Sequence, residues 1–258
     1  MKRVIPMLLA TALLLSMLAV PAGADAESGN DGPAFRDIGH LSQETQATIE
    51  WLYDNGMMNG TADGVFSPDT PFTRAMFVTM MARLENEYYN EPDMRIDEIS
   101  WDGPTIFSDV PQGRWDAPYI KWASENGIVN GIGNDLFNPT GNITTEQFAA
   151  IIGRYLNHLG LTVSWSTENG WDWPPEIYDL YETAEYANDY VVDLLQAGIL
   201  LYEVDGAGVL VNPKHQLTRA EIASMFADLY MILCTQFDYG ISKDTPWGTV
   251  NTKAAYLY

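Results

Sequence analysis

The sequence predicts a mainly α fold made of three tandem helix–loop–helix repeats. Residues 54–84 and 125–155 share a pattern of glycine, apolar loop residue, proline and threonine, and Gly56 and Gly127 are 71 residues apart. A third copy spans residues 196–229, with three extra residues in its loop. Because one such helix pair buries little apolar surface alone, we expect the three copies to share one core.

The chain begins with a predicted signal peptide at residues 1–26. Lys2 and Arg3 precede an apolar run over residues 4–20, and small-residue cleavage sites follow it. The run lies near the lower length limit for a membrane span, so a single membrane anchor is the alternative.

A short first helix precedes the glycine of each copy. The segments ATIEWLYDNG, PYIKWASENG and DYVVDLLQAG each place apolar residues on one helical face. A left-handed residue after a helix is commonly glycine, so we predict that backbone geometry selects Gly56, Gly127 and Gly198. An aspartate lies upstream of each helix, where it can cap or turn the chain. These aspartates are Asp37, Asp109 and Asp179.

A second helix follows a threonine in each copy. Thr218 and Glu221 form a capping box in the third copy. Apolar residues at helical spacing predict the core face of each second helix. They are Phe77, Met80, Met81 and Leu84, then Phe148, Ile151, Ile152 and Tyr155, then Ile222, Met225, Phe226 and Leu229. Arg219 lies in the first turn, at the end of the helix dipole that disfavours a cation. The first copy has Arg74 at this position, whereas the second has Thr145.

These patterns divide the chain into repeats, linkers and a tail. The predicted repeats cover residues 35–84, 105–156 and 176–232. Polar, acidic and aromatic linkers occupy residues 85–104 and 157–175, and a tail occupies residues 233–258.

Charge and cysteine content restrict the partners. The formal net charge of −22 argues against nucleic acid and anionic lipid. Cys234 is the only cysteine, so no intrachain disulfide is possible, and an exported chain of this kind fits a bacterial source.

Motifs for catalysis and for metal binding are lacking. No H-E-x-x-H, G-x-S-x-G, P-loop or G-x-G-x-x-G pattern occurs, and the three histidines match no shared repeat position. The Asp-Gly pairs lack the spacing of a calcium loop. We therefore expect no catalytic residues, no metal site and no cofactor.

The repeated residues resemble three tandem S-layer homology (SLH) repeats, over residues 35–232. The second copy carries Phe107, Asp109, Trp115 and the run Gly127-Ile128-Val129-Asn130-Gly131. The third copy carries Thr218-Arg219-Ala220-Glu221. The resemblance implies a pseudo-threefold arrangement and a bacterial cell-surface anchor, held to anionic, pyruvylated secondary cell-wall polymer attached to peptidoglycan.

The resemblance also implies the ligand-binding residues, in grooves between repeats. They are Arg74, Arg219, Asp37, Asp109, Asp179, Gly56, Gly127, Gly198 and Trp115. A helix N-terminus presents N–H groups to an anion, and an arginine adds a fork for a carboxylate. Because the second copy keeps its threonine cap, we expect that the fold does not need the arginines. Glu146 is expected to add negative charge beside an acidic ligand.

Structural roles remain open for the same residues. Arg74 and Arg219 can form surface or inter-helix salt bridges, and the aspartates can serve as caps. Trp115 fits the core as well as a ligand platform, and Glu44 and Tyr186 occupy its position in the other copies.

The alternative function is a cell-surface protein-interaction module or an S-layer-like structural subunit with diverged grooves. The altered repeat motifs and aromatic linkers favour it, as does the expectation that this chain carries no separate effector domain.

Overall fold

The computed structural model describes residues 35–88, 105–161, 176–206, 208–236, 243–245 and 248–250. The predicted signal peptide and most of the two predicted linkers lie outside these residues. The six longer helices are α2 (Gln43–Asp54), α3 (Arg74–Tyr88), α4 (Ala117–Glu125), α5 (Thr145–His158), α6 (Asn188–Gln196) and α7 (Arg219–Gln236). They confirm the mainly α fold. Helix α7 extends four residues into the segment predicted as a tail.

Short elements complete the described chain. Two 3-10 helices, η3 (Leu180–Glu182) and η4 (Glu185–Ala187), precede α6. Two antiparallel hairpins pair β1 (Glu203–Asp205) with β2 (Gly208–Leu210) and β3 (Lys243–Thr245) with β4 (Gly248–Val250). Among the described residues, no helix has both the length and the apolar content required to cross a bilayer.

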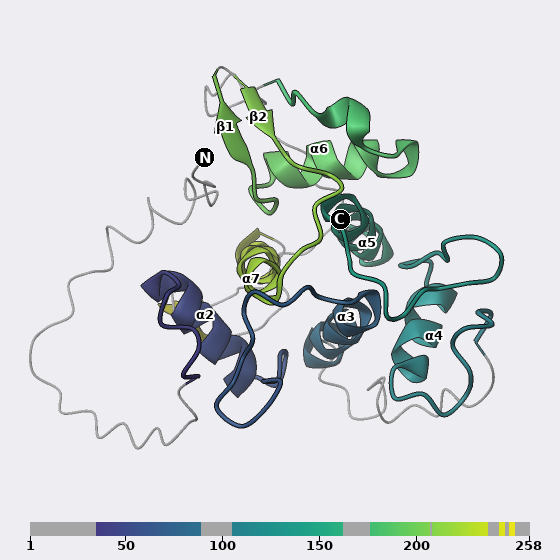
Figure 1. Ribbon diagram of the computed structural model, residues 1–258, viewed down its shortest axis with the longest axis horizontal. Coiled ribbons are helices and arrows are strands. Elements are labelled where there is room, and N and C mark those ends of the chain that lie inside the picture. The colour runs from purple at the N-terminus through teal and green to yellow at the C-terminus, as the bar shows by residue number, and fades with distance from the viewer. Residues whose placement is uncertain are drawn as a thin grey trace, which may run out of the picture.

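The second helices lie at the centre and the first helices lie outside them. Figure 1 shows α3, α5 and α7 around the middle, with α2, α4 and α6 at the periphery. Each first helix packs most extensively against the second helix of the preceding copy. The pairs are α3 with α4, α5 with α6, and α7 with α2, which joins the two ends of the repeat array. The unit seen in the sequence is therefore not the packing unit of the fold.

A ring of backbone hydrogen bonds joins the three segments that lead into the central helices. The Phe72 N–H donates to the Leu217 carbonyl at 2.8 Å, the Leu217 N–H to the Ile143 carbonyl at 2.9 Å, and the Ile143 N–H to the Phe72 carbonyl at 2.9 Å. These residues precede the equivalent threonines of the three copies. The ring fixes the starts of α3, α5 and α7 relative to one another.

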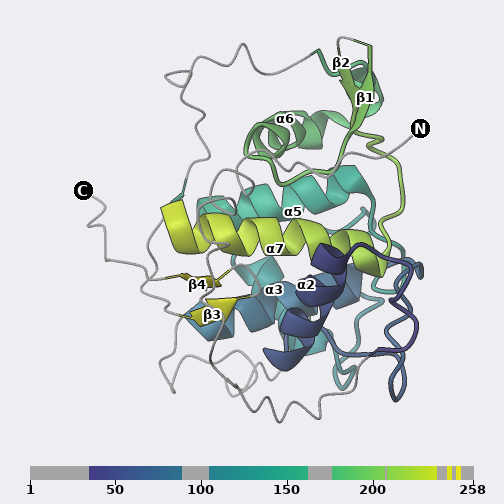
Figure 2. The same cartoon turned by 90° about the vertical axis from the view of Figure 1, so that its left-hand side faces the viewer.

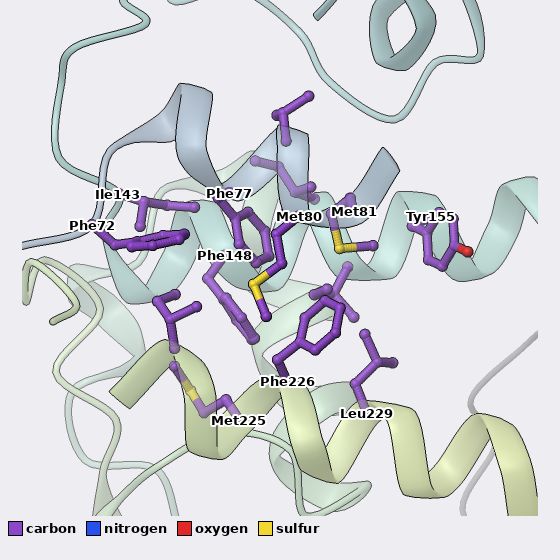
Figure 3. Close-up of a cluster of buried hydrophobic side chains, with 14 of the residues drawn as sticks. Phe72, Phe77, Met80, Met81, Ile143, Phe148, Tyr155, Met225, Phe226 and Leu229 are labelled. Atoms are coloured by element: carbon purple, nitrogen blue, oxygen red, sulfur yellow. The ribbon is translucent and has the colours of Figure 1, made fainter. Parts of the chain in front are cut away.

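The predicted apolar stripes meet between the central helices. Figure 3 shows side chains from α3, α5 and α7 pointing toward one another. All twelve stripe residues are at most 2% exposed. The rings of Phe77 and Phe148 lie 5.0 Å apart, which links the stripes of two copies directly. The expectation that the copies share one core is confirmed. Figure 2 shows α5 and α7 from the side, one above the other and running nearly parallel.

A glycine of α5 lies directly against α6. A Cβ atom added at Gly153 would overlap the ring of Tyr190. Gly153→Ala is therefore expected to lower the free energy of unfolding by about 1–2 kcal/mol, although alanine favours the helix by about 1 kcal/mol. Urea denaturation measures the change. In the Tyr190→Leu background the same substitution should cost less, and an equal cost in both backgrounds would contradict the steric explanation.

Candidate functional site

Arg219 connects the start of α7 to the loop that follows α2. Its side chain is 5% exposed, and its Nε and Nη2 donate to the carbonyls of Phe66 at 2.7 Å and Asn59 at 2.6 Å. The guanidinium also lies 4.4 Å from the centre of the Phe66 ring. Burial lowers the pKa of Arg219 to about 10, against the opposing effect of Asp37, so the side chain stays charged at neutral pH.

Arg74 makes the equivalent contacts with the loop that follows α4. Its Nε donates to the Phe137 carbonyl at 3.0 Å, its Nη2 donates to the Asn130 carbonyl at 3.2 Å, and the guanidinium lies 4.6 Å from the Phe137 ring centre. Neither Arg74 nor Arg219 forms a salt bridge within the described part of the chain. The salt-bridge alternative is therefore wrong for both arginines.

The expectation that the fold does not need these arginines also requires correction. Each guanidinium satisfies two backbone carbonyls of another copy, at the boundary where a first helix packs on a second helix. A buried carbonyl without a partner costs about 1–3 kcal/mol. The arginines thus have a structural role, whatever else they bind.

The helix N-termini are already occupied by the protein. The first two N–H groups of each central helix donate to loop carbonyls of the copy that the helix contacts. The donor–acceptor pairs are Arg74 to Gly141, Ala75 to Pro139, Thr145 to His215, Glu146 to Pro213, Arg219 to Thr70 and Ala220 to Pro68. These groups are not available to an anion, which corrects that part of the expected binding mechanism.

The second copy has Thr145 at the arginine position and Glu146 directly after it. The Glu146 side chain is 7% exposed and accepts Lys214 Nζ at 2.6 and 2.8 Å. It also accepts the Ala184 N–H at 2.8 Å. The negative charge that Glu146 was expected to add beside a ligand is compensated by Lys214. Glu146 therefore connects α5 to the third copy.

The threonine caps differ among the copies. In the third copy the Glu221 N–H donates to Thr218 Oγ1 at 3.3 Å, and the Thr218 N–H donates to Glu221 Oε2 at 2.9 Å, so the capping box is confirmed. Thr73 Oγ1 accepts the Met76 N–H at 3.2 Å. Thr144 makes no side-chain cap bond, and its buried hydroxyl has no partner among the described residues. The expectation that Thr144 caps α5 is wrong.

The three aspartates hold loops of their own copies. Each carboxylate accepts two consecutive backbone N–H groups, at distances between 2.7 and 3.0 Å. Asp37 binds Phe66 and Ser67, Asp109 binds Phe137 and Asn138, and Asp179 binds Val211 and Asn212. The second residue of each pair has a positive φ, between 50° and 60°, so the carboxylate stabilises a strained turn. Ligand contact by these aspartates remains a prediction.

Electrostatics agree with this role for Asp37. Burial alone would raise its pKa, but the hydrogen bonds from Phe66 and Ser67, aided by the charge of Arg36, lower the pKa overall. The charged form of Asp37 is thus favoured in the folded protein.

Gly56, Gly127 and Gly198 have φ values of 67°, 69° and 74°. A Cβ atom at any of the three would meet no atom within 4 Å. The left-handed backbone, rather than crowding, selects glycine there, which confirms the predicted backbone role.

Trp115 lies on the surface. Its side chain is 60% exposed, so the alternative of a core residue is wrong. Tyr186, at the equivalent position of the third copy, is 49% exposed. Exposed aromatic rings of this kind can cover the apolar face of a sugar ring.

Arg154 was missed by the sequence analysis. Its guanidinium lies 5.9 Å from the ring centre of Tyr186 and 5.8 Å from that of Tyr190. The charge of Arg154 also lowers the pKa of Arg74, after the larger effect of burial. Arg83 lies 71 residues before Arg154, and this shared spacing is the signal that could have identified it.

These residues bring three copies together at one place. Arg74 comes from α3 of the first copy, Arg154 from α5 of the second, and Tyr186 from η4 of the third. Two cations and an aromatic ring suit an acidic sugar. Among the described residues, no group of three or more histidine, cysteine, aspartate or glutamate side chains is arranged to hold a metal ion.

Comparison with known proteins identifies a family for two parts of the chain. The profile of the S-layer homology domain matches residues 34–76 and 106–149. These segments contain Arg74, Asp37, Asp109 and Trp115.

The similar proteins are longer surface proteins and enzymes. The chain is 29% identical over 230 residues to an endoglucanase of Bacillus sp. (strain KSM-635), covering 88% of this chain and 22% of that protein. It is 27% identical over 217 residues to the S-layer protein sap of Bacillus anthracis, covering 84% and 23%. It is 29% identical over 174 residues to a cell surface protein of Thermoanaerobacter kivui, covering 67% and 20%. The chain thus spans less than a quarter of the length of each of these relatives.

Proposed function

We propose that this chain is a non-catalytic anchoring module for an anionic, pyruvylated secondary cell-wall polymer, because residues 34–76 and 106–149 match the profile of the S-layer homology domain. The domains and the surface-protein relatives locate the chain at the bacterial cell surface. The enzymes among its relatives are much longer than this chain, and their activity is not transferred to it. The third copy of the sequence pattern is proposed to be a third SLH repeat.

The observation that best supports an anionic ligand is the electrostatic interaction of Arg74 with Arg154. The protein as a whole is strongly acidic, with a net charge of −22, yet the charge of Arg154 acts on Arg74 and lowers its pKa, after the larger effect of burial. The repulsion between two such cations is relieved when a carboxylate binds between or beside them. The pyruvyl group of the proposed polymer carries a carboxylate of this kind.

The exposed aromatic residues support a sugar ligand. Tyr186 stands beside Arg154, within reach of one ligand that contacts both. Trp115 is the equivalent residue of the second copy and is proposed as the platform of another groove. The polymer would thus be bound by a cation together with an aromatic face.

Arg154→Ala tests this site with little effect on the fold. We expect at least a 5-fold loss of affinity for purified cell wall, because a charge-assisted contact contributes about 1 kcal/mol or more. Sedimentation with cell wall, before and after removal of the polymer, measures the affinity. Lys121→Ala removes the same charge from α4 and is the matched control. Equal binding by the two variants would reject the site, and equal retention on polymer-free peptidoglycan would reject the polymer.

A protein partner is the second candidate. Several large apolar side chains are exposed, with Tyr181 at 83%, Ile106 at 71% and Val204 at 55%. Solvent-exposed apolar and aromatic side chains are common at binding surfaces. A pull-down of surface proteins, with light scattering of the pure chain, separates this function from polymer binding.

A further inference from the structure

A pocket lies where the second copy lacks the arginine of the other two copies. Thr145 lines it, together with Leu201, Glu203, Val211 and Glu221. Its volume is about 20 Å³. The pocket is bounded by the start of α5, the loop that follows α6 and the first turns of α7, so it lies at a boundary between copies.

The pocket corresponds to the space that a guanidinium fills elsewhere in the molecule. Arg219 reaches the carbonyls of Asn59 and Phe66, and Arg74 reaches those of Asn130 and Phe137. The equivalent residues of the third copy are Leu201 and Val211. Both line the pocket, and among the described residues no backbone N–H outside the helices and strands donates to either carbonyl. The residues whose carbonyls hold an arginine in two copies thus line a gap in the third.

No cation of the described chain takes the place of the missing arginine. Lys214 is the neighbouring basic residue, and both oxygens of Glu146 engage its ammonium group. The ionisable residues that line the pocket are Glu203, Glu221 and His215, and His215 Nε2 contacts Glu221 Oε2 at 2.9 Å. The two carboxylates of this wall favour a positive ligand.

The same change of charge occurs at other equivalent positions. Arg83 and Arg154 correspond to Asp228 in the third copy, and Trp115 and Tyr186 correspond to Glu44 in the first. Moving on by one copy, Thr145 corresponds to Arg74, Asp228 to Arg154, and Glu44 to Tyr186. The residues proposed to bind an anion in one groove are thus replaced in the next by a threonine and two residues with carboxyl groups.

We propose that the pocket beside Thr145 binds a guanidinium group supplied by a ligand, such as an arginine side chain of a partner protein. The planar fork lets two nitrogen atoms donate to the carbonyls of Leu201 and Val211 at once, as Nε and Nη2 do in the other copies. Glu203 and Glu221 supply the complementary charge. This site differs in ligand charge from the polymer site, and its failure would leave the proposed anchoring function untouched.

Titration of the full chain with methylguanidinium tests the pocket. We expect saturable shifts of the Thr145, Leu201 and Val211 amide signals in NMR spectra, with a dissociation constant on the order of millimolar. Methylammonium at the same ionic strength should bind at least 5-fold more weakly, because it cannot span the two carbonyls. Equal effects of the two cations, or shifts that never saturate, would overturn the assignment.

Two variants complete the test. In Thr145→Arg the introduced side chain should occupy the pocket. This variant should lose the saturable shifts and have a higher melting temperature. Glu203→Gln lies at a half-buried position of the β1–β2 hairpin and should weaken methylguanidinium binding about 3-fold or more without unfolding the chain. Thr145→Ser keeps the pocket and is the control that should bind as the parent does. Undiminished binding by Glu203→Gln and by folded Thr145→Arg would reject the site.

Discussion

Arg219→Ala is expected to lower the free energy of unfolding by about 3 kcal/mol. The substitution leaves the carbonyls of Asn59 and Phe66 without their charged donor and uncovers the Phe66 ring. A hydrogen bond to a charged group contributes about 1.5–3 kcal/mol, and the two losses are not fully additive. Because the bonds join α7 to the loop after α2, the loss weakens the contact that connects the last copy to the first.

Urea denaturation measures the effect, and the chain supplies its own control. Thr145→Ala alters the equivalent position in the copy that lacks the guanidinium, and should cost less than about 1 kcal/mol. Arg219→Lys should recover little, because an ammonium group does not reproduce the planar fork. Equal losses for Arg219→Ala and Thr145→Ala would contradict the structural role of the arginine.

This result also decides how binding experiments are interpreted. If Arg74→Ala reduces both stability and polymer binding, the binding loss does not identify a ligand contact. Arg154 makes ring contacts rather than bonds to buried carbonyls, so its substitution separates recognition from folding. The proposed polymer site therefore rests more securely on Arg154 than on the two arginines found by motif.

Local pattern predicted the elements of the fold well. Apolar spacing identified the buried faces, and Gly127 adopts the left-handed conformation expected after a helix. The capping box of Thr218 and Glu221 forms as its spacing predicts. Each of these features depends on residues a few positions apart, so a single sequence contains the information.

Partners between copies could not be predicted in the same way. The period of 71 residues does not say whether α4 packs on its own α5 or on α3 of the preceding copy. The acceptors of Arg74 are backbone carbonyls, which leave no mark in the sequence. The ion pair of Glu146 could not be predicted either, because its partner, Lys214, lies 68 residues away.

Asp228→Asn is expected to stabilise the protein most at alkaline pH. Burial raises the pKa of Asp228 to about 8, and the negative charge of Glu44 adds to the shift. The Oδ2 atom is buried and has no hydrogen-bond partner among the described residues. At pH 7 the folded protein therefore holds this carboxyl group mostly protonated, whereas the unfolded chain, with a pKa near 3.8, has released the proton.

The sign of the pH effect follows from proton binding. Between about pH 4 and 8 the folded state binds one more proton than the unfolded state, so the free energy of unfolding falls by up to about 1.4 kcal/mol per pH unit as the pH rises. Above pH 8 both states are deprotonated and the dependence ends. After allowance for solvent screening, we expect the Asp228 contribution to fall by about 2 kcal/mol from pH 5 to pH 8.

Asparagine keeps the shape of Asp228 and cannot ionise, so this part of the pH dependence should disappear in Asp228→Asn. Urea denaturation at pH 5, 6, 7 and 8 gives the curves to compare. Asp205→Asn, at an exposed position of the β1–β2 hairpin, is the control and should follow the parent protein. Glu44→Gln should flatten the curve in part, because it removes the carboxylate that opposes ionisation of Asp228. Parallel curves for Asp228→Asn and the parent would show that Asp228 ionises normally and that the boundary between α7 and α2 tolerates both charges.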